Sequence, residues 1–147
     1  RILSGLYALL RPLDLIRPYR LEMGSNLAIK GNYGLYQFWG SKISQAIAKQ
    51  ARAINANAVL NLASKEYWGV VELHLPKGLK IITIDFKEQG EDGLRFNSFG
   101  AKKARGTMAR FICQNRLTNV LAVREFNLDN YRFNSVNSND NLWQFVR

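Results

Sequence analysis

The most distinctive group of side chains is a run of cations that contains no acidic residue. Between Arg95 and Arg116 the sequence has no Asp or Glu, in a chain with 21 Lys and Arg against 11 Asp and Glu and a net charge of +10. Like charges on one helix repel, and a polyanion such as a nucleic-acid backbone would relieve that repulsion. A solvated face on a basic protein is the competing explanation, but the charge of the whole chain favours binding. The predicted nucleic-acid contacts here are Lys102, Lys103, Arg105 and Arg110.

A second basic cluster contains two Arg-Pro steps that are six residues apart. Pro12 and Pro18 fix their own φ and push the preceding residue out of the helical region, so the two arginines are held in extended or turn geometry. The planar guanidinium group suits phosphate as well as carboxylate. An ion pair of Arg20 with Glu22 or Asp14 is the alternative explanation. The predicted nucleic-acid contacts in this cluster are Arg11, Arg17, Tyr19 and Arg20.

An enzymatic alternative rests on one carboxylate and one hydroxyl. Glu22 has the chemistry of a general acid or base, although a lone carboxylate beside arginines is more often an ion-pair partner. Ser64 is a conceivable nucleophile with Lys65 as its base, but no Gly-x-Ser-x-Gly sequence surrounds it, and a helix N-cap is the simpler interpretation. The alternative hypothesis is therefore an enzyme that acts on a nucleotide or a DNA base. Its pocket would gather Arg20, Glu22, Ser64, Lys102 and Arg105, with Glu22 as acid/base.

Composition limits the cofactors, the partners and the compartment. With one cysteine, Cys113, and one histidine, His74, the chain cannot build the usual Cys/His zinc site, and we predict no cofactor and no metal. A metal site built from the oxygen ligands of Asp and Glu remains an alternative. No apolar run approaches the roughly 18 residues that cross a bilayer, so we predict no membrane partner. A lone cysteine fits a reducing compartment, and we predict the cytoplasm. The sequence does not indicate an oligomeric state.

Hydrophobic periodicity predicts a mixed α/β fold, a mixed sheet flanked by helices. The spacing of Leu3, Leu6, Leu9 and Leu10 predicts a helix that opens the chain, and 3–8 vaguely suggests a helix-hairpin-helix-like element. The basic helix (Lys102–Arg116) and the arginine loop (Arg11–Arg20) are expected to line one electropositive cleft. The other expected elements are helices over 35–54 and 101–116, a strand at 58–63 with a short helix after it, a β-hairpin over 80–99, and strands at 131–133 and 142–146.

Ordered blocks along the chain resemble the YaaA family of bacterial peroxide-stress-resistance proteins. The blocks span most of the sequence, so the resemblance is specific. They cover residues 3–7, 10–16, 18–24, 35–40, 61–67, 101–106 and 115–117, and the match continues into 131–133 and 143–147. The family usually has glycine where this chain has Ala8, which weakens the helix-hairpin-helix interpretation.

The resemblance implies a fold, a partner and a cellular role. The expected fold is an unusual α/β domain whose positively charged cleft binds double-stranded or branched DNA. The implied role is that of a cytoplasmic protein induced by hydrogen peroxide, which limits damage by keeping unincorporated iron low. Because the chain has one histidine and one cysteine, any effect on iron is expected to be indirect. Family members carry a further N-terminal stretch before the position of Arg1, so residues 1–147 are expected to form a single domain without its N-terminal part.

Overall fold

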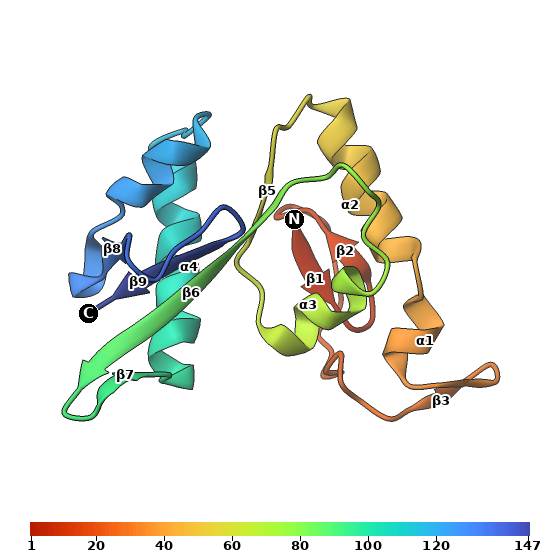
Figure 1. Cartoon of the computed structure of the whole chain (residues 1–147). Helices are drawn as coiled ribbons and strands as arrows, with labels where there is room; N and C mark the ends of the chain where they lie inside the picture. Colours follow the sequence, from red (N-terminus) through yellow and green to blue (C-terminus); the bar gives the residue numbers. More distant parts are fainter. The chain divides into compact units, whose positions relative to one another are not determined.

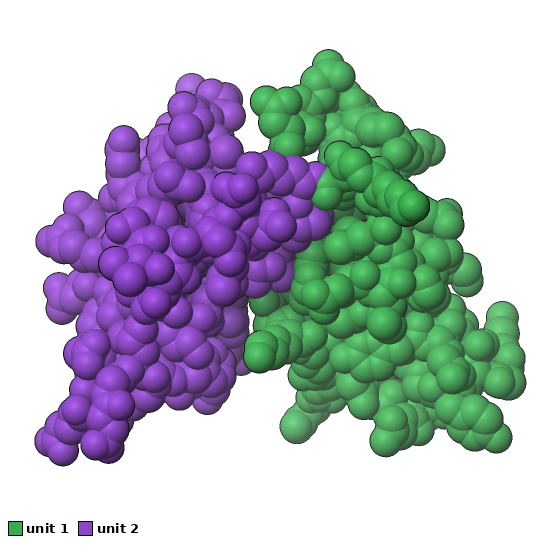
Figure 2. Space-filling view, viewed as in Figure 1, with its two compact units in different colours: residues 1–57, 63–79 green, residues 58–62, 80–147 purple.

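The computed structural model describes all residues from 1 to 147 and divides them into two compact units. Unit 1 contains Arg1–Asn57 and Ala63–Leu79, and unit 2 contains Ala58–Leu62 and Lys80–Arg147 (Figure 2). Helices and a mixed sheet confirm the predicted α/β class. The expectation of one domain over 1–147 stays a prediction.

Unit 1 combines two small β-hairpins with three helices (Figure 1). Its buried apolar side chains come from the helices and from Met23, which is fully buried. The helix of 65–72 begins at Ser64, whose hydroxyl accepts a hydrogen bond from the backbone N–H of Tyr67, so the predicted N-cap is confirmed. The elements are β1 (Ile2–Ser4), β2 (Ala8–Leu10), β3 (Ala28–Ile29), β4 (Asn32–Tyr33), α1 (Leu35–Trp39), α2 (Lys42–Ala53) and α3 (Lys65–Glu72).

The prediction of a helix at the start of the chain is wrong, because residues 2–10 form the antiparallel hairpin β1–β2. Leu3 pairs with Leu9 across the hairpin. The leucine spacing that predicts one face of a helix therefore places these two residues opposite each other on neighbouring strands. At Gly5 a Cβ would lie 2.4 Å from the backbone oxygen of Leu21, which requires glycine at the turn. Ala8 has a φ of 60°, a conformation that glycine adopts without strain. The helix-hairpin-helix-like element is not confirmed, since the first helix begins at Leu35.

The helix predicted over 35–54 is present but interrupted. Helix α1 ends at Trp39, and α2 begins at Lys42. Gly40 lies between them with φ 47° and ψ −129°, and glycine is a weak helix former, so the helix breaks at this residue.

Unit 2 is built on a mixed sheet in which β5, β6, β9 and β8 are neighbours in that order. Strands β5 and β9 run parallel to β6, whereas β8 pairs antiparallel with β9. Gly90 and Gly93 close the predicted hairpin between β6 and β7, but its second strand ends at Arg95, and residues 98–99, predicted as strand, begin the next helix instead. The expected strands at 58–63, 131–133 and 142–146 are therefore confirmed. The bounds are β5 (Val59–Asn61), β6 (Ile81–Gly90), β7 (Gly93–Arg95), β8 (Arg132–Asn134) and β9 (Leu142–Val146).

One face of this sheet carries the core of unit 2. Burial alternates along β6, and the buried side chains Ile82, Ile84 and Phe86 point to the face that α4 (Ser98–Gln114) covers. Figure 1 shows α4 lying against β6, and Trp143 and Phe145 of β9 belong to the same buried cluster. Two short 3-10 helices, η1 (Val120–Glu125) and η2 (Leu128–Asn130), follow α4, and Val123 of η1 joins the same core. The packing holds α4 as a rigid element.

Candidate nucleic-acid interface

Helix α4 begins at a side-chain cap. The Oδ1 atom of Asn97 accepts hydrogen bonds from the backbone N–H groups of Phe99 and Gly100, both at 3.1 Å. This satisfies two donors that a helix start otherwise leaves unpaired. The predicted helix is thus confirmed, but it ends at Gln114, and Arg116 lies beyond it with a φ of 50°.

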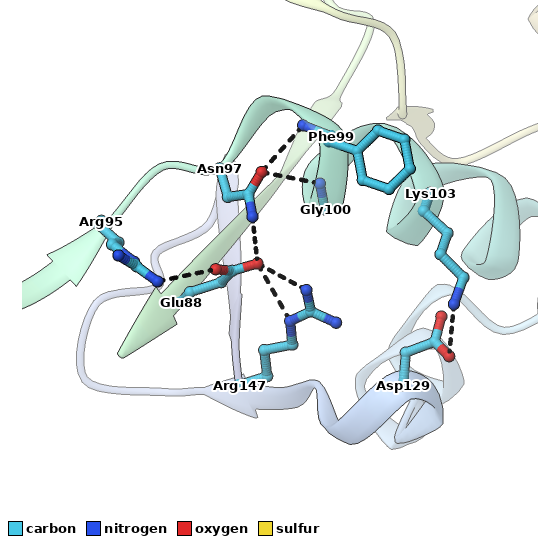
Figure 3. A network of polar contacts seen from close by, with 8 residues as sticks. All are labelled: Glu88, Arg95, Asn97, Phe99, Gly100, Lys103, Asp129 and Arg147. Atoms are coloured by element: carbon cyan, nitrogen blue, oxygen red, sulfur yellow. Dashed lines mark hydrogen bonds and ion pairs between the residues drawn. The ribbon is translucent and has the colours of Figure 1, made fainter. Parts of the chain in front are cut away.

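The cap is held by a polar network around Glu88, which is 8% exposed (Figure 3). Its Oε1 accepts from Arg147 Nη2 at 2.7 Å and from Asn97 Nδ2 at 3.0 Å, and Arg95 lies 3.8 Å from Oε2. The hydrogen bonds from Arg147 and then from Asn97 lower the pKa of Glu88. In return, Glu88 raises the pKa of Arg147. The network therefore joins the chain end, β6 and the start of α4 through one carboxylate.

The cations of α4 lie on the side opposite its buried residues. Ala101, Ala104 and Met108 are at most 1% exposed, whereas Lys102, Lys103 and Arg110 are exposed. Three of the four predicted cations of α4 are therefore exposed.

The basic face of α4 is not free of acids in three dimensions. Lys103 Nζ lies 3.3 Å from Asp129 Oδ1, a residue of η2 that is 26 positions away in the sequence. The hydroxyl of Thr107 also donates to Asp129. Lys102 and Arg110 have no carboxylate within ion-pair distance. Arg105 is half-buried, and burial lowers its pKa while Asp85 acts in the opposite direction.

Two of the three arginines in the unit 1 loop are neutralised locally. Arg11 Nε lies 2.7 Å from Asp14 Oδ1, and the backbone N–H of Arg11 donates to the other carboxylate oxygen. This backbone hydrogen bond, followed by the side-chain bond, lowers the pKa of Asp14. Arg20 Nε lies 3.3 Å from Glu22 Oε1, so the ion pair predicted as the alternative is present. Arg17 has no ion pair.

Tyrosines hold this loop against the β1–β2 hairpin. The hydroxyls of Tyr19 and Ser4 share a hydrogen bond, and the rings of Tyr7 and Tyr19 meet edge to face at 5.4 Å. The backbone N–H of Arg17 donates to the Tyr7 hydroxyl at 3.2 Å. Tyr19 therefore positions the loop, and its hydroxyl is already engaged.

The two residues of the enzymatic alternative have structural partners. Glu22 accepts from its own backbone N–H and from Arg20, and these bonds lower its pKa, which opposes proton donation near neutral pH. The hydroxyl of Ser64 caps α3. Both residues belong to unit 1, whereas Lys102 and Arg105 belong to unit 2. The convergence of these residues in one pocket stays a prediction.

The predicted DNA-contacting residues divide between the units in the same way. Arg11, Arg17, Tyr19 and Arg20 lie together in unit 1, and the four predicted cations of α4 lie together in unit 2. That both clusters line one cleft stays a prediction.

Sequence reasoning missed three residues of the α4 surface: Phe99, Gly106 and Asp129. Phe99 is 79% exposed, and Gly106 is exposed in mid-helix. Helical spacing from Lys103 would have found Gly106, whereas Phe99 falls in the segment predicted as a strand of the hairpin over 80–99. Asp129 carries no such signal, because only the tertiary fold brings it to Lys103.

Unit 1 contains a hollow outside both basic clusters. It measures about 540 Å³ and lies between the end of α2 and residues 76–79, with Arg52 and Lys77 among its lining residues. None of the predicted site residues lines it. No three His, Cys, Asp or Glu side chains gather where they would share a metal ion. None of the helices has the length and apolar character needed to cross a membrane.

Comparison with known proteins gives the family. The family model described as "Peroxide stress protein YaaA" matches residues 1–137. A UPF0246 protein of Rhizorhabdus wittichii is 53% identical over 147 residues, covering 100% of this chain and 58% of the relative. A UPF0246 protein of Saccharophagus degradans is 48% identical over 149 residues, covering 100% and 57%. One from Clostridium perfringens is 42% identical over 147 residues, covering 100% and 58%.

These matches define a class of bacterial stress protein, and the sequence resemblance is confirmed. The chain belongs to the YaaA peroxide stress protein family. It spans less than three fifths of the length of these curated relatives.

Proposed function

We propose that this chain binds DNA, chiefly through its phosphates, as part of a cytoplasmic peroxide-defence protein. The observation that supports the proposal most is the exposed basic face of α4, on which Lys102 and Arg110 have no acidic partner. Lysine and arginine contacts to phosphate release condensed counterions and supply affinity without reading sequence. Double-stranded and branched DNA both offer the required backbone.

The role in peroxide defence follows from the family, and we extend this role to the control of free iron. We propose that the protein lowers damage by hydrogen peroxide partly by keeping free iron low, and that it does so indirectly. The composition supports the indirect route, since one histidine and one cysteine supply few soft ligands for iron. Calorimetry with ferrous iron is expected to give no binding heat, and a saturable heat would contradict the indirect route.

The DNA proposal is tested by measuring affinity against salt. Between about 50 and 200 mM salt, affinity for duplex DNA is expected to fall steeply, because counterion release weakens as salt rises. A flat dependence over this range would overturn phosphate-driven binding.

A charge-matched pair of variants tests the location of binding. Replacing Lys102, Lys103 and Arg105 with Ala is expected to weaken binding to all DNA sequences about equally. The control replaces Lys49, Lys65 and Lys77 with Ala, which removes the same charge from exposed positions in unit 1. If the control weakens binding equally, or if the α4 variant loses only one sequence, phosphate contact through α4 is the wrong mechanism.

A further inference from the structure

We infer that the exposed face of α4 takes a single strand of nucleic acid, with an unpaired base stacked on Phe99 and the strand passing over Gly106. This inference rests on the proposed DNA binding, duplex binding included, and adds that one face of α4 prefers unpaired strands. The face is defined by Phe99, Lys102, Lys103, Gly106 and Arg110, and we refer to it as the Phe99 face.

The five residues form one continuous stripe along the helix. At about 100° per residue, Phe99, Lys103, Gly106 and Arg110 fall within an arc of roughly 60°, with Lys102 beside it. A rise of about 1.5 Å per residue spreads them over roughly 16 Å. The stripe therefore has an aromatic ring at one end, cations near both ends and a glycine between them.

Phe99 is an aromatic ring without a partner inside the protein. It is 79% exposed, and its backbone N–H is fixed by the Asn97 cap, so the backbone that carries the ring is held in place. Figure 3 shows the ring beside Lys103. An exposed aromatic ring among cations is what base stacking needs, because every base has a flat face to offer.

Gly106 has no explanation within the chain. A Cβ at this position would meet no atom within 4 Å, so the packing of α4 does not require glycine. Glycine in a helix interior costs about 1 kcal/mol relative to alanine. Absence of a side chain in mid-helix instead permits close approach of another backbone. The position of Gly106 between Lys103 and Arg110 is where a bound strand would pass closest.

The Phe99 face fits an unpaired strand better than a duplex. In a duplex the flat faces of the bases are stacked on their neighbours, so Phe99 would have no base face to contact. Lys102 and Arg110 remain available for the phosphates of the strand. Charge and aromatic character thus both match single-stranded nucleic acid.

The test compares one labelled oligonucleotide of about 12 bases as a single strand and as a duplex. Phe99→Ala is expected to weaken single-strand binding about ten-fold, from the loss of one stacked base, and to leave duplex binding unchanged. Phe99→Tyr keeps a flat ring and is expected to retain single-strand affinity. If Phe99→Ala leaves single-strand affinity unchanged, or weakens both forms equally, the inference is overturned.

Substitutions at Gly106 provide an independent test with two readouts. Gly106→Ala is expected to raise the midpoint of thermal unfolding and at the same time weaken single-strand binding, and Gly106→Leu is expected to weaken it further. Ala53→Leu adds bulk at an exposed position of α2 and is expected to change neither. If both Gly106 variants bind as the unsubstituted chain does, the close approach is wrong. Duplex binding that does not depend on salt, or the absence of duplex binding, would instead refute the proposed DNA function itself.

Discussion

The two basic clusters of this protein differ in how their charge is neutralised. In unit 1, Arg11 and Arg20 lie against carboxylates three and two residues away, at 2.7 and 3.3 Å. On α4 only Lys103 has such a partner, whereas Lys102 and Arg110 have none. Exposed ion pairs add little to stability, but a carboxylate beside a cation competes with phosphate for it. We therefore expect α4 to supply the larger share of DNA affinity.

The clusters also differ in what holds them. The cations of α4 project from a helix of 17 residues packed on a sheet. The arginine loop instead rests on the β1–β2 hairpin through contacts of Tyr7 and Tyr19. A surface that more packing contacts hold in place before binding loses less conformational entropy when the ligand arrives. The helix is therefore the better preorganised surface of the two.

The largest expected effect comes from breaking the support of the arginine loop. Gly5→Ala would place a Cβ 2.4 Å from the backbone oxygen of Leu21, and we expect the free energy of unfolding to fall by roughly 1–3 kcal/mol. Urea denaturation measures the change. The matched control is Gly106→Ala in α4, where the new methyl group meets no atom and stability is expected to rise. Equal effects at the two glycines would contradict the difference in support.

Acid is expected to weaken the support of α4 through Glu88. Hydrogen bonds from Arg147 and Asn97 hold its pKa below the usual value of about 4.3. The folded state therefore favours the charged carboxylate, which stabilises the protein above that pH and loses its effect as pH falls through the lowered pKa. Denaturation between about pH 3 and pH 6 should show a steeper loss of stability on acidification than in Glu88→Gln. Parallel curves for the two proteins would refute this role of Glu88.

The smallest expected effect is a gain in affinity. Asp129→Asn removes the carboxylate that lies 3.3 Å from Lys103, so that lysine becomes available for a phosphate. We expect the slope of log affinity against log salt to steepen by up to about 0.9, the contribution of one phosphate contact. Fluorescence anisotropy with duplex DNA measures it. Weaker binding by Asp129→Asn would show that the ion pair positions Lys103 for DNA and does not compete with it.

Local patterns predicted the elements whose signals lie within a few residues. Ala101, Ala104 and Met108 have helical spacing and are buried, and the turn between Gly90 and Gly93 closes the hairpin. The first ten residues were mispredicted because a short run of leucines fits a helix and a hairpin equally well. What decides between them is Leu21, whose backbone oxygen approaches Gly5 from outside the segment.

The site was predicted less completely than the fold, for the same reason. The cations of α4 follow from sequence, but their partners do not. The interval between Arg95 and Arg116 contains no acid, yet Asp129 reaches Lys103 from η2. Phe99 gave no signal as part of an expected strand, and it becomes conspicuous only once α4 is seen to begin at Ser98. Charge counted along the chain therefore overstates the free charge on the surface.

The most direct test of the account is the salt dependence of duplex binding by two double variants. One replaces Lys102 and Arg110 with Ala, and the other replaces Arg11 and Arg20 with Ala. We expect the α4 variant to lower the steepness of the salt dependence by up to about 1.8, which corresponds to two phosphate contacts, and the loop variant to lower it by less. An α4 variant that keeps the full slope, or a loop variant that loses more, would contradict it.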